Sequence, residues 1–588
     1  MHPIRHRNRP AKSLVLLSVV FAAASSIECA GATRAPVSAA PAVSPATYDV
    51  VIAGARVVDG TGNPWFYGDV AVRGDRIARV APAGALANDR ATTRIDGRGM
   101  VVAPGFIDIQ SHSWNALLFA DGRVVSKVTQ GVTTEILGEA TTPAPVNDAV
   151  LALYDFGPGD SVPARLYRGF TGPRGFGRWL DAMGRHANSV NVGSYLGATT
   201  VRAYAKGQAQ GPATPAELDT MRAVVREAMR DGAFGVSSAL IYPPGSYAQT
   251  IELIAEARAM APYHGVYITH MRSEDDSLFE AMDEALRIGR EGDVPVEIYH
   301  LKAAGPRNWP KAVGMVAKID SARAAGQDVG ATMYPYAASG NGLDACFPPA
   351  AAENGKLLAN LRDPAGRARI IRQMTDTAPG APDYCQRSGP STYMIVGFSR
   401  PELTRYEGMR LDAIAAAMGK PWADAVVDMV LAEENRLDKI NFSMSDENVA
   451  MQLKRPWVII GTDAGGTNPD SAKGLVHPRA YGSYPRILGK YVREEGVLAL
   501  EDAVRKMSSA VAERLSLRDR GLLREGMYAD IVVFDPATII DRATFAEPHR
   551  ISTGVRDVFV NGVAVLRDGK HTGATPGKVV RGPGYGMK

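Results

Sequence analysis

Short apolar runs rich in β-branched residues alternate with longer segments of helical periodicity through the middle of the chain. Apolar residues recur every three or four positions at 250–260, 276–291 and 311–325, which predicts helices there. Eight runs have the length and composition of buried strands, at 101–109, 131–138, 188–196, 232–242, 266–271, 294–301, 329–336 and 457–463. Eight strand–helix units in succession are typical of an α/β protein with a (β/α)8 TIM barrel.

The two ends of the chain have a different pattern, with short alternating strands separated by tight turns. Residues 48–100 and 513–575 share it, and the pair Asn561-Gly562 between two alternating runs is a strong hairpin signal. We predict one small β-sandwich domain built from both segments. The barrel would then occupy 101–512 with an insertion within 337–456, and 576–588 would form a tail.

The first 32 residues have the pattern of a secretory signal peptide. Basic residues precede an apolar core, and a small-x-small cleavage sequence ends at Ala32. The core is too short to favour a stable membrane span, and an uncleaved anchor is the alternative. Lipid attachment at Cys29 fits less well because Glu28 precedes it. We therefore expect an exported protein, periplasmic or secreted, with a flexible spacer at 33–47.

Composition adds little chemistry but excludes some partners. The chain of 588 residues is 46% hydrophobic and 22% charged, as expected of a globular protein with a sizeable core. The leader contributes +3 of the formal net charge of +4, so the remainder is close to neutral and favours neither nucleic acid nor a membrane surface as partner. Cys346 and Cys385 lie beyond the leader. They could form a disulfide after export or remain two unpaired core residues.

Imidazole and carboxylate groups stand at or just after the ends of several predicted strands. Because barrel strands present their carboxyl ends at one face, these side chains would meet there. A lone histidine in such a place is more often a hydrogen-bonded core residue, but two on neighbouring strands favour a hydrolytic metal centre. The candidates are His112, Glu139, His270, His300 and Asp463.

Several longer stretches make the pattern specific. They are PGFID at 104–108, QGVTT at 130–134, THMR at 269–272, HLK at 300–302, YPY at 334–336, GTD at 461–463, HPRAYGSYPR at 477–486 and GLLREGMYADIVVFDP at 521–536. On these stretches the chain resembles the amidohydrolase superfamily, and within it the D-aminoacylase (N-acyl-D-amino-acid deacylase) family, from Tyr48 to about Gly573. The resemblance implies zinc-dependent hydrolysis of the amide bond of a small N-acyl-D-amino acid.

The resemblance also implies a role for each candidate. His270 and His300 would be zinc ligands, and Asp463 would be the general base and acid. The family has His-x-His at the end of strand one, where this chain has Gln110 and His112. Gln110 is a poor zinc ligand, so we expect one functional Zn²⁺, with His112 either holding a weak second ion or donating a hydrogen bond.

Near the end of strand two the family usually has a cysteine ligand, and this chain has Glu139. Two imidazoles and one carboxylate are an established catalytic zinc set, so Glu139 would replace the thiolate. The alternative is that Glu139 forms an ion pair with a base such as Lys302.

Four residues match the substrate-binding positions of the family. Lys302, Tyr334 and Arg479 would bind the free carboxylate of the amino acid, and Tyr242 would line the pocket. A solvated surface arginine is the alternative for Arg479. The serine expected six residues after Tyr334 is replaced by Gly340, so the substrate range can differ from that of the family.

Three other functions remain compatible with the sequence. A dipeptidase or cyclic-amide hydrolase of the same superfamily would use the same chemistry with a different pocket. A deaminase would release ammonia. A degenerate, non-catalytic binding protein would explain the missing first histidine at Gln110.

Overall fold

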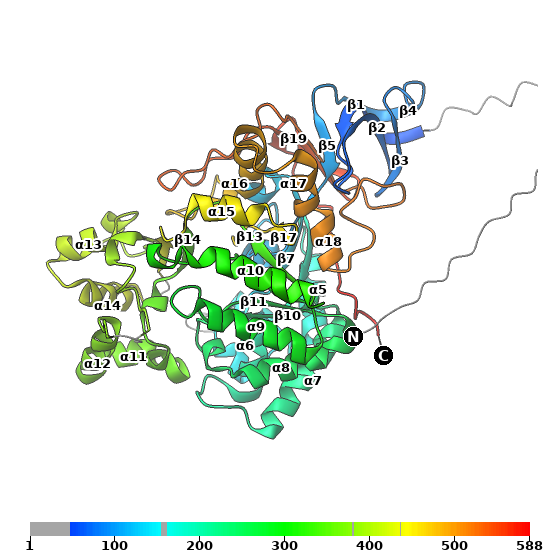
Figure 1. The fold of residues 1–588 in the computed structure, drawn as a ribbon. Coiled ribbons are helices and arrows are strands. Elements are labelled where there is room, and N and C mark those ends of the chain that lie inside the picture. The colour runs from blue at the N-terminus through cyan, green and yellow to red at the C-terminus, as the bar shows by residue number, and fades with distance from the viewer. Residues whose placement is uncertain (1–46, 155–160, 379–381, 435–436, 588) are drawn as a thin grey trace, which may run out of the picture. The chain divides into compact units, whose positions relative to one another are not determined.

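The computed structural model describes residues 47–154, 161–378, 382–434 and 437–587 (Figure 1). The predicted signal peptide, and all of the predicted spacer except Thr47, lie outside the described residues. No helix in these ranges has both the length and the apolar character that a membrane crossing needs.

One sheet is built from both ends of the described chain. Its strands hydrogen-bond in the order β21-β20-β19-β18-β5-β1-β2-β3, with β4 pairing with β1. Asn561 and Gly562 both have positive φ, as a tight hairpin turn between β19 and β20 requires. The strands are β1 (Thr47–Val57), β2 (Phe66–Arg73), β3 (Arg76–Pro82), β4 (Arg90–Asp96), β5 (Val101–Pro104), β18 (Ile531–Phe534), β19 (Val555–Val560), β20 (Val563–Arg567) and β21 (Lys570–His571).

The parallel strands of the middle region form two sheets, β6-β7-β8 and β17-β13-β12-β11-β10-β9. Only Tyr195 separates β8 from β9. At the other seam the Asp463 amide donates to the Gln110 carbonyl at 2.9 Å. The two sheets are therefore linked at both seams, which is the connectivity expected of the predicted barrel. The strands are β6 (Phe106–Asp108), β7 (Val132–Leu137), β8 (Asn191–Ser194), β9 (Leu196–Gly197), β10 (Gly235–Ala239), β11 (Val266–His270), β12 (Val296–Ile298), β13 (Val329–Met333) and β17 (Val458–Ile460).

The first predicted strand, 101–109, is divided between two sheets. β5 pairs with β18 in the terminal sheet, and β6 pairs with β7 in the parallel one. Gly105 stands between them, and a Cβ there would lie 2.3 Å from the Thr133 side chain. The chain therefore changes sheets at a glycine, which periodicity alone does not reveal.

Helices follow most parallel strands, and α8, α9 and α10 cover them on one side (Figure 1). The prediction for 250–260 matches α8, whereas α9 begins two residues later than predicted, at Leu278. Asp276 stays outside α9 and pairs with Arg307 at 2.8 Å. The helices of this region are α1 (Trp114–Leu118), α2 (Val125–Val128), α3 (Asp148–Leu151), α4 (Val162–Arg168), α5 (Gly175–Arg185), α6 (Ala198–Lys206), α7 (Pro215–Asp231), α8 (Thr250–Met260), α9 (Leu278–Gly292), α10 (Lys311–Ala324), α15 (Asp446–Leu453), α16 (Arg479–Arg486), α17 (Leu500–Met507) and α18 (Ser509–Arg514), with a π-helix at Ile487–Glu494.

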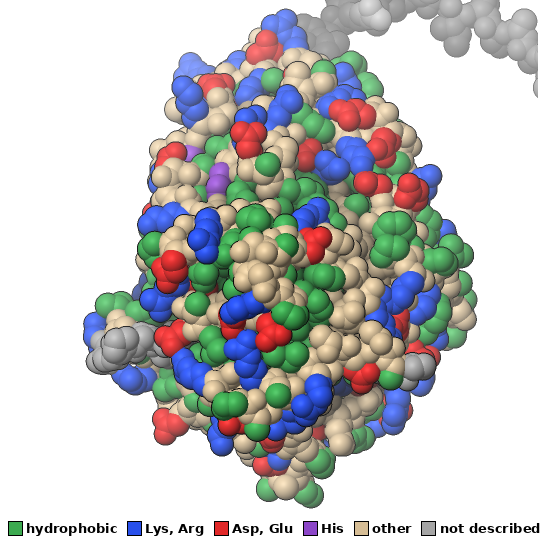
Figure 2. All heavy atoms as spheres, turned by 90° about the vertical axis from the view of Figure 1, so that its left-hand side faces the viewer, with side chains coloured by type: hydrophobic (Ala, Val, Ile, Leu, Met, Phe, Trp, Pro, Cys, Tyr) green, Lys and Arg blue, Asp and Glu red, His purple; other side chains and the backbone are tan. Residues whose placement is uncertain are grey.

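The segment between β13 and β17 has an apolar core of its own, in which Leu343, Ile395 and Val426 are buried. A disulfide joins Cys346 to Cys385, which decides between the two sequence-based alternatives. On the face that this segment occupies, acidic and basic side chains are interspersed (Figure 2). Its elements are β14 (Ser339–Gly342), β15 (Tyr393–Val396), β16 (Asp438–Asn441), α11 (Leu357–Arg362), α12 (Pro364–Met374), α13 (Leu411–Met418) and α14 (Trp422–Glu433).

The predicted tail packs against the parallel strands. The Gly577 amide donates to the Asn188 carbonyl at 2.8 Å, and the amides of Val192 and Val580 donate to the carbonyls of Lys578 and Val192. Residues 577–580 thus extend along β8, and the chain then reaches Gly232 and Arg230 at the end of α7.

Candidate metal centre

Five polar side chains from five strand ends converge, as the alternation of strands and helices predicts. His270 is the last residue of β11, and His300 lies two residues beyond β12. Glu139, Asp463 and His112 follow β7, β17 and β6. His300 and Asp463 have positive φ, an unfavourable backbone conformation for these residues that is often found at functional sites.

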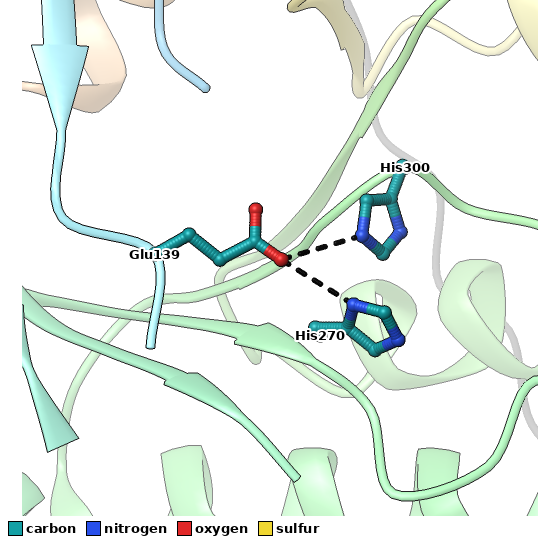
Figure 3. Close-up of side chains that lie close together, drawn as sticks. All are labelled: Glu139, His270 and His300. Atoms are coloured by element: carbon teal, nitrogen blue, oxygen red, sulfur yellow. Dashed lines mark hydrogen bonds and ion pairs between the residues drawn. The ribbon is translucent and has the colours of Figure 1, made fainter. Parts of the chain in front are cut away.

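Glu139, His270 and His300 form the first group of potential metal ligands (Figure 3). One oxygen of Glu139 lies 3.3 Å from His270 Nδ1 and 3.6 Å from His300 Nε2. The donor atoms of the three residues all lie within 4.8 Å of one another. Two imidazole nitrogens and a carboxylate oxygen at this spacing fit a divalent ion such as zinc.

A second group shares the same glutamate. The other oxygen of Glu139 lies 3.5 Å from His112 Nε2, which in turn lies 3.0 Å from Asp463 Oδ1. The Gln110 amide nitrogen donates to this second oxygen at 2.7 Å. Gln110 therefore holds Glu139 in place, so the residue that departs from the family pattern has a structural role here.

Glu274 belongs to the site, although no sequence signal selected it. Its carboxylate lies 3.0 Å from His300 Nδ1 and 3.6 Å from His270 Nε2, the ring nitrogens that face away from Glu139. It also accepts from Lys302 Nζ at 2.6 Å. A carboxylate on the far nitrogen of a ligating histidine orients the ring and raises its basicity.

The same contacts shift the pKa values of the buried groups. Burial alone would raise the pKa of Glu139, but hydrogen bonds from both imidazoles outweigh it and hold the pKa well below its usual range. Burial and the ammonium of Lys302 would lower the pKa of His300, but the surrounding carboxylates raise it to about 9. Burial would also raise the pKa of Asp463, yet Arg479 and neighbouring imidazoles lower it. Asp463 is thus ionised at neutral pH, as a base must be.

The four predicted substrate-binding residues lie around these groups. Arg479 is buried, so it is no solvated surface arginine, and its Nη1 lies 2.6 Å from Asp463 Oδ2. Its guanidinium also lies 4.6 Å from the ring centre of Tyr334. The Tyr242 ring centre is 6.0 Å from that of His270. Lys302 pairs with Glu274 and not with Glu139, against the alternative considered for Glu139.

This fold and site define a class of enzyme. Residues 93–566 match the amidohydrolase family model, and the chain belongs to that family of hydrolases acting on amide bonds. Within it the chain belongs to the D-aminoacylase (N-acyl-D-amino-acid deacylase) family. It is 35% identical over 543 residues to a D-aminoacylase of Alcaligenes xylosoxydans xylosoxydans, covering 91% of this chain and 97% of that protein.

Two solved structures show the same likeness in three dimensions. A D-aminoacylase with a binuclear metal centre, activated by one metal and attenuated by the second, is 33% identical with a TM-score of 0.74. An N-acyl-D-glutamate deacylase from Bordetella bronchiseptica, in complex with zinc and a phosphonate mimic of the tetrahedral intermediate, is 30% identical with a TM-score of 0.72. Both matches cover 91% of this chain and all of the other.

Proposed function

We propose that the protein hydrolyses N-acyl-D-amino acids to a carboxylate and a free D-amino acid, with one zinc ion sufficient for activity. One observation carries the proposal. The buried guanidinium of Arg479 lies 2.6 Å from Asp463, whose other oxygen lies 3.0 Å from His112 in the second donor group. A fixed cation beside the general base suits a substrate whose free carboxylate stands one carbon from the amide nitrogen.

Glu139, His270 and His300 would hold the ion. When bound there, zinc would supply a water of lowered pKa, about 7, and a positive charge for the amide carbonyl. Asp463 accepts a proton at its carboxylate and passes it to the departing nitrogen, a transfer that contributes about 10²–10⁴-fold. Arg479 and Tyr334 orient the carboxylate of the substrate, and Glu274 pairs with the imidazole of His300 at 3.0 Å.

The second group, His112 with Glu139 and Asp463, has only three protein donors because Gln110 replaces a histidine. It shares the proposed base, so an ion there would compete with proton transfer at Asp463. This supports one working ion. Titrating metal-free protein with zinc should give full activity at one equivalent, and a requirement for two would contradict this count.

The substrate class is tested with a panel. Purified protein is assayed with N-acetyl and longer N-acyl derivatives of D-amino acids, with their L-enantiomers as matched controls, and with dipeptides and hydantoins. We expect release of free amino acid from D-substrates and no ammonia. Turnover of dipeptides or hydantoins without turnover of N-acyl-D-amino acids would replace the proposal, and tight binding without turnover would indicate a non-catalytic protein.

We also propose export, supported by the leader pattern and by the Cys346–Cys385 disulfide, since such bonds persist in oxidising compartments. Protein from a periplasmic or secreted fraction should begin near Thr33 and, after denaturation, react with no thiol reagent. A thiol count of two in that fraction would contradict the expectation.

A further inference from the structure

A fully buried lysine lies beneath the seam where β6 meets β17. Lys127, in α2, is 0% exposed, and its ammonium makes three hydrogen bonds. They reach Asp108 Oδ2 at 2.6 Å, Thr462 Oγ1 at 2.5 Å and the Ala464 carbonyl at 2.7 Å. All three protons of the ammonium are therefore used.

Two of these bonds go to the residues on either side of Asp463. The backbone of Asp463 has φ of 52°, in the left-handed region that is unfavourable for a residue with a side chain. Such a conformation persists only where the surrounding structure holds it. Lys127 provides that restraint, because it binds the residue before Asp463 by its side chain and the residue after it by its carbonyl.

Asp108 extends the restraint to the opposite strand. Its carboxylate accepts from the Thr462 amide at 2.9 Å and the Thr462 hydroxyl at 2.6 Å, and also from the Gln110 amide at 3.2 Å. The His112 amide donates to the Ala464 carbonyl at 3.2 Å. One buried network therefore holds the chain segments that carry Asp463 and His112.

We propose that Lys127 is a positioning residue for the general base. Its ammonium donates to Asp108, Thr462 and Ala464 and not to the side chains of the metal groups, and it fixes the backbone at Asp463 so that the carboxylate meets His112 and Arg479. The kinetic part of this inference rests on the proposed function, whereas the geometric part does not.

Lys506, in α17, offers a matched control at the opposite end of β17. It is also 0% exposed, and its ammonium donates to backbone carbonyls of Arg455 and, at 3.0 Å, of Val458, at the amino end of β17. Lys127→Met and Lys506→Met therefore each remove one buried ammonium that a helix places against β17, one at each end of that strand.

The geometric test is a crystal structure of each variant with its metal. In Lys127→Met we expect Asp463 to leave the left-handed region and its carboxylate to lose the 3.0 Å contact with His112. In Lys506→Met we expect both features to be kept. An unchanged Asp463 in Lys127→Met would overturn the proposal, whether or not the enzyme acts on N-acyl-D-amino acids.

The kinetic test uses the best N-acyl-D-amino acid substrate. Displacing a proton-transfer group by about 1 Å typically costs about 10²-fold, so kcat of Lys127→Met should fall by that factor with KM unchanged. Equal losses in Lys127→Met and Lys506→Met would mean that both act only through stability, and would overturn the proposal. A wild-type protein inactive on every N-acyl-D-amino acid would instead refute the proposed function.

Lys127→Met leaves the Asp108 carboxylate buried without its cation, which destabilises the fold independently of Asp463, so a second variant is needed. The double variant Lys127→Met/Asp108→Asn removes both charges while the amide oxygen can still accept from the Thr462 and Gln110 amides. The same displacement of Asp463 is expected in it. If Asp463 keeps its wild-type position in the double variant, the proposal is overturned, as it would be for the single variant.

Discussion

Both ends of the parallel strands bury charged side chains, but the charges are arranged differently. At the amino ends, opposite charges pair directly with one another. Arg514 lies between Glu297 at 2.8 Å and Asp328 at 3.0 Å. At the carboxyl ends a single carboxylate, Glu139, faces two imidazoles with one oxygen and His112 with the other.

This difference distinguishes charged residues that stabilise the fold from those that bind a ligand. Two opposite charges in a buried ion pair neutralise each other and leave no site for an ion. Several donors around one shared carboxylate leave a site for a cation. Burial or a shifted pKa alone would identify both ends of the strands as candidate functional sites. Convergence of nitrogen and oxygen donors identifies only the carboxyl ends.

The largest expected effect comes from removing an imidazole at the carboxyl end. His270→Ala should lose bound metal and activity together, because two protein donors hold a catalytic ion poorly. His264 precedes the same strand at its amino end and is exposed, so His264→Asn is the control and should keep both. Metal analysis and turnover of one preparation give the answer. Full metal content in His270→Ala would show that His270 is not a metal ligand.

Asp463→Asn should keep the metal and lose about 10²–10⁴-fold in kcat, because the amide cannot accept the proton. Asparagine tolerates the positive φ at this position, so the backbone should persist. Asp328→Asn removes a carboxylate at the amino end and should leave kcat unaltered. Retained turnover in Asp463→Asn would remove that residue from the mechanism.

Arg479→Met should raise KM by about 10–100-fold, the usual worth of a charge-assisted hydrogen bond, with a smaller effect on kcat. Arg479 lowers the pKa of Asp463, so that pKa should be higher in the variant. As the pH is lowered, the variant should therefore lose activity at a higher pH than wild type does. Arg505→Met, at the amino end of the strands, should change neither. An unaltered KM would mean that another group binds the substrate carboxylate.

The smallest expected effect is on stability. Burial raises the pKa of Glu297 from 4.5 to about 7, against the opposing charge of Arg514. The stability contributed by its proton is therefore present below pH 4.5 and lost as the pH rises through 7.

Glu297→Gln removes this pH dependence. From about pH 5 to pH 8, the free energy of unfolding of wild type should fall by about 2 kcal/mol more than that of Glu297→Gln. Urea unfolding at the two pH values measures this, with the exposed Glu513→Gln as control. Equal pH dependence in the variant and wild type would show that Glu297 is ionised at both.

The order of strands and helices could be predicted because buried strands and amphipathic helices have different apolar periods. The sequence could not show that 101–109 divides at Gly105, since both parts are equally apolar and the division depends on contact with Thr133. The sequence also could not show that the tail packs on β8, because the hydrogen bonds between them join backbone atoms.

Candidate ligands could be predicted from their place at strand ends. Glu274 and Lys127 could not, because each acts through contacts between separate loops or helices and neither ends an apolar run. The sequence marks Gln110 as a poor metal ligand, and only its 2.7 Å bond to Glu139 shows its structural role. Side chains that support ligands leave weaker signals in sequence than the ligands themselves.

The carboxylate of Glu139 also determines how the centre responds to reagents that attack thiols. No sulfur atom is among the donors of either metal-binding group, and the two cysteines of the described chain are already joined to each other. A carboxylate is not oxidised by peroxide and does not react with alkylating or mercurial reagents, whereas a thiolate ligand is open to all three. Exposure to such reagents should therefore leave the donors of this centre intact.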